Sequence, residues 1–297
     1  MVIYTGLTHP INTGYSEFML YTNHSRTFKE NMYVYPVLSR RSKGISVGIN
    51  LNPDKVCNFD CVYCQVGRKV PHEKVSVDVQ RLLVELKETL DLVKTGRIFS
   101  NPPFNSIPPE LQHLSDIAIS GDGEPTTFPH FYEVVKDIIQ LKNSMSDNVK
   151  LVLISNSSGF NRSKVQEALD LLYQNNGEVW AKLDAGSETY YKKVSRSNIP
   201  FEEIIRNITL TAKRHSLIIQ SCFNKVFNLL PSMDEIEKYS YTLKSIKENG
   251  GRIRLVQLYT VARVPSERFV TPLSEAELTS IAVKVKEIAG IRSEIYS

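Results

Sequence analysis

Apolar positions along this chain fall into two alternating patterns. Short runs rich in β-branched residues, such as residues 45–50, are typical of buried strands. Longer stretches carry apolar residues at helical spacing, as Leu82, Leu86 and Leu90 do within residues 77–94. The pattern predicts strands at 45–50, 116–120, 150–154, 178–183, 217–223 and 253–258, and helices at 77–94, 131–142, 163–173, 201–214, 233–247 and 274–288.

Strands that alternate with helices in this way predict an α/β protein with a parallel sheet and right-handed crossovers. Six such units are fewer than the eight of a full barrel, so a partial (βα)6 TIM-like barrel is the first expectation and a doubly wound sheet the second. Ser274 and Glu277 have the spacing of a capping box at the start of the last helix. Residues 1–32 are polar and weakly periodic, so we expect an N-terminal extension followed by one core domain over residues 33–297, with a C-terminal helix and a short tail.

Composition places the chain among ordinary globular proteins. Its 297 residues are 41% hydrophobic and carry a formal net charge of +4, with basic side chains in short pairs rather than a block. Such pairs favour a solvated surface over a nucleic-acid-binding face. No apolar run approaches the roughly 18 residues that span a bilayer, and the first residues lack the pattern of a secretory leader. We therefore expect a cytoplasmic protein without a membrane partner.

Three of the four cysteines lie within eight positions, at Cys57, Cys61 and Cys64, which excludes a disulfide framework. Three thiolates in one loop can hold a [4Fe–4S] cluster and leave one iron open for another ligand. A zinc site that adds His72 is the main alternative, although the chain offers no second cysteine pair. Buried thiols that pack as small hydrophobic groups are a weaker alternative, because the loop is rich in polar residues.

The cysteine run has the form C-x3-C-x-aromatic-C, with Tyr63 before Cys64, and it follows the first predicted strand. In this it resembles the radical S-adenosylmethionine (SAM) superfamily. The resemblance implies that Cys57, Cys61 and Cys64 bind a [4Fe–4S] cluster, whose open iron is chelated by the amine and carboxylate of SAM. It further implies an oxidoreductase or modifying enzyme that reductively cleaves SAM to methionine and a 5′-deoxyadenosyl radical. An electron donor such as flavodoxin or ferredoxin would be required.

A second motif, Gly-Asp-Gly-Glu-Pro-Thr at residues 121–126, follows the second predicted strand. Alone it would be read as a turn, but in this position it resembles the Gly-Glu segment of the same superfamily. The resemblance makes Gly123, Glu124 and Pro125 candidates for binding SAM. We expect the glycines to allow a close approach of the ligand, and backbone carbonyls with the Glu124 carboxylate to accept hydrogen bonds from the methionine ammonium.

Three further positions match the superfamily less closely. Asn156 follows the third strand and could contact SAM or organise its loop, and Asp184 ends the fourth strand near the expected ribose site. Asp184 could equally cap a helix. Gln257 lies on the last strand, where adenine usually meets backbone, or could simply form a hydrogen bond in the core. Tyr63 completes this set of candidate cofactor-binding residues, whereas no catalytic residue can be named.

Segments 35–41, 48–51, 61–68 and 261–263 resemble a branch related to the wyosine-base tRNA synthetases, which suggests an RNA base, carried by tRNA, as substrate. That branch holds a second cluster with further cysteines, but only Cys222 remains here, in an apolar strand typical of core filling. Arg40, Arg41 and Arg263 could bind phosphate or carboxylate, or only hold loops. Alternatives are radical modification of a peptide, a protein glycyl site or a small metabolite, and a zinc-stabilised binding module.

Overall fold

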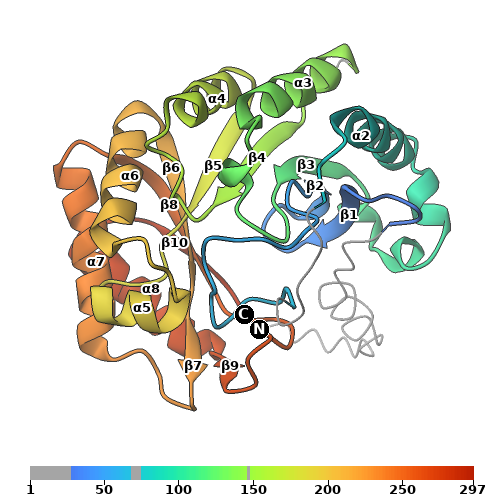
Figure 1. The fold of residues 1–297 in the computed structure, drawn as a ribbon. Helices are drawn as coiled ribbons and strands as arrows, with labels where there is room; N and C mark the ends of the chain where they lie inside the picture. Colours follow the sequence, from blue (N-terminus) through green and yellow to red (C-terminus); the bar gives the residue numbers. More distant parts are fainter. Residues whose placement is uncertain (1–27, 68–74, 146–147) are drawn as a thin grey trace, which may run out of the picture.

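The computed structural model describes residues 28–67, 75–145 and 148–297. Eight strands form one curled sheet with helices on its outer side, as Figure 1 shows. The extension expected over residues 1–32 lies almost wholly outside the described residues, as does His72. The strands of this sheet, in spatial order, are β1 (Val34–Ser39), β2 (Gly44–Ile49), β3 (Leu114–Ile119), β4 (Lys150–Ser155), β5 (Gly177–Lys182), β6 (Ser216–Cys222), β8 (Arg252–Tyr259) and β10 (Ser293–Tyr296).

All neighbouring strands run parallel except β1, which pairs with β2 in antiparallel register. The sheet therefore forms a partial parallel barrel, and the expected fold class is confirmed. A separate two-stranded sheet joins β7 (Asn224–Val226) to β9 (Val270–Pro272). The helices are α2 (Val79–Lys94), α3 (Phe131–Ser144), α4 (Ser163–Gln174), α5 (Glu188–Ser195), α6 (Phe201–Arg214), α7 (Met233–Glu248) and α8 (Glu275–Ala289), with 3-10 turns at Arg97–Ser100, Phe104–Ser106, Pro109–Leu111 and Pro125–Thr127.

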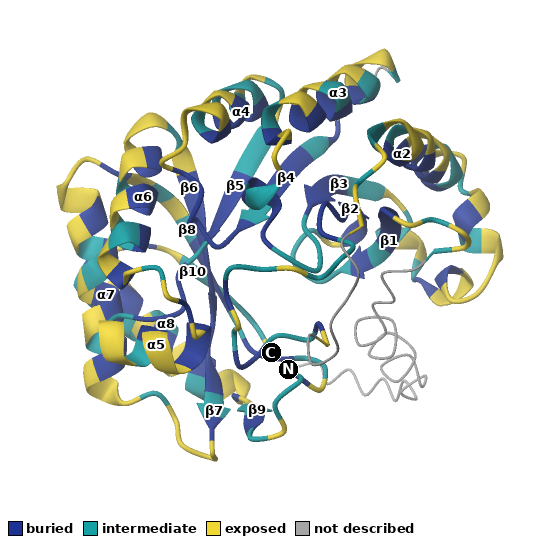
Figure 2. Cartoon of the chain, viewed as in Figure 1, coloured by how far each residue is buried: buried dark blue, intermediate teal, exposed yellow. Residues whose placement is uncertain are grey.

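The main core lies between the sheet and the outer helices, whose inner faces are buried (Figure 2). Leu82, Leu86 and Leu90 of α2 are fully buried, as their spacing predicts. The capping box of α8 is present, since Ser274 and Glu277 bind each other's backbone N–H groups. Among the described residues, the search for a helix long and apolar enough to cross a membrane finds none.

A smaller apolar cluster of Ala118, Val152, Trp180 and Ile218 fills part of the barrel interior. Because side chains alternate along a strand, Trp180 and Lys182 share the inner face of β5. This apolar cluster fills one layer of the barrel interior, and polar side chains such as Lys182 lie nearer the carboxyl ends of the strands. Ligands of parallel α/β folds bind at those ends.

Candidate active site

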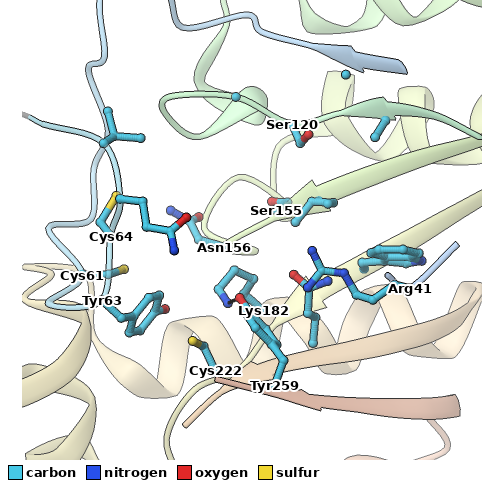
Figure 3. A pocket seen from close by; sticks show the side chains of 18 of the residues that line it. Arg41, Cys61, Tyr63, Cys64, Ser120, Ser155, Asn156, Lys182, Cys222 and Tyr259 are labelled. Carbon is cyan, nitrogen blue, oxygen red and sulfur yellow. Dashed lines mark hydrogen bonds between the residues drawn. The ribbon is translucent and has the colours of Figure 1, made fainter. Parts of the chain in front are cut away.

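A cavity of about 330 Å³ opens inside the barrel, a volume within the range of small-molecule sites. Figure 3 shows Cys61 and Cys64 on one side of it, Arg41 on the opposite side and Lys182 between them. Most of the residues that the sequence nominated meet here. They are Cys57, Cys61, Cys64, Tyr63, Gly123, Glu124, Asn156 and Asp184.

The cysteine loop is anchored to the rest of the chain through its backbone. The N–H of Asp60 donates to the Ser195 carbonyl at 3.1 Å, and the N–H of Val62 donates to the Val194 carbonyl at 2.9 Å. Both acceptors lie at the end of α5, a helix that the sequence pattern did not predict. The carbonyl of Cys64 also accepts the N–H of Ser266. The loop is therefore held on two sides before any cofactor binds.

The three thiols are half-buried and suit a cluster better than a single ion. Burial, with a further contribution from Asp184, raises the pKa of the Cys61 thiol, and a bound cation such as iron would favour its thiolate form. No three His, Cys, Asp or Glu side chains within the described ranges are grouped to hold one metal ion. A cubane does not need such convergence, because its thiolates bind different irons. The donor set fits a [4Fe–4S] cluster, and its role as ligand stays a prediction.

Glu124 is buried and receives hydrogen bonds from four donors. Its Oε1 accepts the backbone N–H of Thr126 at 3.1 Å and the hydroxyls of Thr126 and Ser155 at 2.6 Å each. Its Oε2 accepts the backbone N–H of Asn156 at 2.7 Å. Burial raises the pKa of this carboxyl, whereas the hydrogen bonds oppose that rise. A carboxylate offers about four lone-pair sites, so Glu124 chiefly joins the loops that follow β3 and β4.

The glycines of the second motif make room for neighbouring parts of the chain, and both also line the cavity, so the close approach of a ligand there stays a prediction. A Cβ on Gly123 would lie 2.1 Å from the carbonyl oxygen of Val56, in the approach to the cysteine loop. A Cβ on Gly121 would lie 2.2 Å from Oδ1 of Asn50. Both contacts are too short for any side chain, so the glycines allow the first and second motifs to pack together.

Asn156 also binds the cysteine loop. Its Nδ2 donates to Oδ1 of Asn58 at 2.8 Å, and Nδ2 of Asn58 donates to Oγ of Ser158 at 2.7 Å. This geometry corresponds to the loop-organising role that the sequence left open for Asn156. It also identifies Asn58 as a residue that the sequence analysis did not single out.

Asp184 joins three elements around the cavity. It accepts the hydroxyl of Tyr63 at 2.5 Å, the ammonium of Lys182 at 3.1 Å and the backbone N–H of Cys222 at 2.7 Å. Burial lowers the pKa of Lys182, but the charge of Asp184 and the contact with Tyr259 raise it by more. Ser187, not Asp184, caps α5. Asp184 therefore neutralises Lys182 while holding the aromatic residue of the cysteine motif.

Two nominated residues do not line the cavity. Gln257 is buried on β8 and accepts a hydrogen bond from Nε2 of Gln220, its neighbour across the strand pair, at 3.1 Å. Pro125 is buried in the 3-10 turn after Glu124. Gln220 faces the cavity instead, together with Trp180 and Tyr259, which the sequence analysis did not nominate. Alternation from Lys182 would have placed Trp180 on this face.

Comparisons with known proteins relate this chain to one superfamily. The family model described as Radical SAM superfamily matches residues 51–219, more than half of the chain. A UPF0026 protein of Helicobacter pylori strain J99 is 32% identical over 146 residues, covering 48% of this chain and 40% of the relative. The UPF0026 protein of strain 26695 is 29% identical over 250 residues, covering 82% of this chain and 70% of the relative.

One solved structure shares the fold at low sequence identity. It is described as TYW1 with a lysine-pyruvate adduct bound, and it aligns with a TM-score of 0.53 at 14% identity. The alignment covers 92% of this chain and 81% of that one. The fold described above is therefore a known architecture.

Proposed function

This chain belongs to the radical SAM superfamily and is an enzyme that uses a [4Fe–4S] cluster and SAM, and from that premise we propose that Cys57, Cys61 and Cys64 are the cluster ligands. The observation that carries the proposal is that all three thiols, Gly123 and Glu124 face one cavity. When bound, the cluster and SAM supply reductive cleavage to methionine and a 5′-deoxyadenosyl radical, which removes hydrogen from a substrate. This family membership replaces the zinc-stabilised binding module considered from the sequence.

The chain's own residues position these groups. Glu124 holds the Gly-Glu loop against the loop after β4, so that backbone carbonyls around Gly123 can accept hydrogen bonds from the SAM ammonium. Asn156 and Asp184 fix the cysteine loop through Asn58 and Tyr63 respectively. We assign Glu124, Asn156 and Asp184 chiefly to positioning, whereas Pro125 and Gln257 would act only through their backbone.

We propose an RNA base, with tRNA as its carrier, as the substrate. Support comes from the resemblance of segments 35–41 and 261–263 to the wyosine branch, while the likeness to TYW1 at 14% identity concerns the fold. The solved TYW1 structure is described as having a lysine-pyruvate adduct bound. In this chain Lys182 lines the cavity, but it is engaged by Asp184 and Tyr259. The sequence holds one further cysteine, Cys222, so a second cysteine-bound cluster is not part of the proposal.

The remaining assignments follow from this function. Reductive cleavage needs an electron from outside the chain, and flavodoxin or ferredoxin is the proposed donor. The main sheet begins at Val34, which is compatible with a catalytic domain over residues 33–297 preceded by an extension.

Anaerobic reconstitution tests the proposal. We expect about four irons per chain and conversion of SAM to 5′-deoxyadenosine when dithionite is added. Stoichiometric zinc without SAM cleavage would reject the assignment. To identify the substrate class, 5′-deoxyadenosine formation is measured in the presence of total tRNA, of extract peptides or of small metabolites. Each mixture is tested at several salt concentrations, because RNA binding is salt-dependent. Failure of tRNA to stimulate cleavage, with stimulation by peptides or metabolites, would replace the RNA base with the corresponding alternative.

A further inference from the structure

The end of the cavity opposite the cysteines contains an arginine beside two aromatic rings. Arg41 lies in the turn between β1 and β2, and its guanidinium carbon is 5.0 Å from the ring centre of Tyr259 and 5.8 Å from that of Trp180. Figure 3 shows its side chain reaching into the pocket towards Lys182. Both distances are within cation–π range, so the rings help fix the position of the guanidinium.

Two other charged side chains lie near this end. Lys182 is paired with Asp184 and donates to Tyr259. Asp116 accepts the hydroxyl of Ser46, and the charge of Arg41 lowers the pKa of this buried carboxyl against the rise that burial causes. Unlike Lys182, Arg41 has no carboxylate of the described residues, Asp116 included, within ion-pair distance of its guanidinium. The preceding Arg40 also lines the cavity and donates to the carbonyl of Ser297.

We propose that Arg41 binds an anionic group of the substrate, a carboxylate or a phosphate, at this end of the cavity. The guanidinium has five N–H donors in a planar fork that matches either group. Asp116 acts on this charge only from beyond ion-pair distance, whereas an anionic ligand would place an opposite charge in direct contact with the guanidinium. The inference rests on the proposed function, because it orients the substrate with its anion at Arg41 and its reacting carbon towards SAM.

Lys182 is a poorer candidate for the same role. Its charge is neutralised by Asp184, whose carboxylate would also repel an approaching anion. The ring of Tyr259 lies near both cations, namely Lys182, whose charge Asp184 neutralises, and Arg41. Arg40 and Arg263 also line the cavity, but Arg41 is the arginine that lies over the rings of Trp180 and Tyr259 at this end, so we assign the anion preference chiefly to Arg41.

Calorimetry on the cluster-loaded enzyme with SAM tests the inference with three probes of similar shape: benzoate, phenyl phosphate and neutral benzamide. We expect at least one anion to bind about tenfold or more tightly than benzamide, which is typical of a charge-assisted hydrogen bond. Benzoate against phenyl phosphate then distinguishes the two anions. Arg41→Gln should abolish the preference, and Arg41→Lys should retain only part of it because lysine lacks the fork.

The matched control is Arg214→Gln, which removes a guanidinium that is paired with Asp170 on the outer helices and does not line the cavity, so the variant should keep the full preference. Trp180 is the single tryptophan of the chain, so its emission reports whether a probe reaches this end. No anion preference in the wild type, or an equal preference in Arg41→Gln, overturns the inference. Substrate-free SAM cleavage, measured in parallel, tests the proposed function separately, since its absence would reject that function while the probe result still judges Arg41.

Discussion

The loops that carry the two motifs face the same cavity but are built differently. The cysteine loop presents half-buried thiols and is held mainly through its backbone, at Asp60 and Val62. The Gly-Glu loop buries Glu124, and protein donors use nearly all of its acceptor capacity. The cysteine loop leaves its thiols available to bind a cofactor, whereas the Gly-Glu loop uses the Glu124 carboxylate in hydrogen bonds within the protein. Substitutions in the cysteine loop should therefore abolish SAM cleavage, and substitutions in the Gly-Glu loop should weaken the binding of SAM.

The largest effect is expected from Cys61→Ala. Loss of one of three ligands should leave the chain without a stable cluster, and 5′-deoxyadenosine formation should fall to background. Iron analysis and product chromatography measure both quantities. Cys222→Ala is the matched control. This cysteine is buried at the end of β6 and is not one of the proposed cluster ligands, so the iron content should be unchanged. Retention of four irons in Cys61→Ala would contradict the assignment.

Asp184→Asn should have the next largest effect. It leaves the ammonium of Lys182 without its carboxylate, and breaking a buried ion pair typically costs about 3–5 kcal/mol. Chemical denaturation of the cluster-free protein measures the loss. The control is the double variant Asp184→Asn/Lys182→Met, in which no unpaired charge remains and much of the stability should return. If the double variant is no more stable than the single one, Asp184 acts through Tyr63 instead.

Glu124→Gln should cost about 1–3 kcal/mol, because an amide nitrogen replaces an oxygen that accepts a hydrogen bond from buried donors. If Glu124 is a positioning residue, SAM binding should weaken while iron content stays normal, as measured by equilibrium dialysis and iron analysis. Glu188→Gln on α5 is the control, since its pair with Lys192 is exposed and should contribute little. Unchanged SAM affinity in Glu124→Gln would contradict the assignment of Glu124 as a positioning residue.

The same contrast explains how much the sequence could predict. Strong periodicity identified six of the seven described strands that pair in parallel and six of the helices, and the family resemblance of the cysteine run indicated the cofactor. The edge strand β1 contains Pro36 and β10 has four residues, so neither gives a clear strand pattern. The sequence also could not show that Gly123 makes room for Val56, because that contact joins residues far apart in the chain. Local patterns find elements and ligands, whereas loop-to-loop packing requires the fold.

The smallest effect is expected at Arg196, where the cysteine loop meets solvent. Its guanidinium lies 2.8 Å from Glu267 and 3.4 Å from Asp60, and all three side chains are partly exposed, so Arg196→Ala should cost below about 1 kcal/mol. Arg196 also has φ of 47°, in the left-handed region at the end of α5. Arg196→Gly should therefore be more stable than Arg196→Ala, because glycine adopts this conformation without strain. Thermal unfolding of both variants distinguishes the contribution of the ion pairs to stability from that of the backbone conformation. A loss above about 2 kcal/mol in Arg196→Ala would mean that side-chain charges, rather than backbone bonds to α5, hold the cysteine loop.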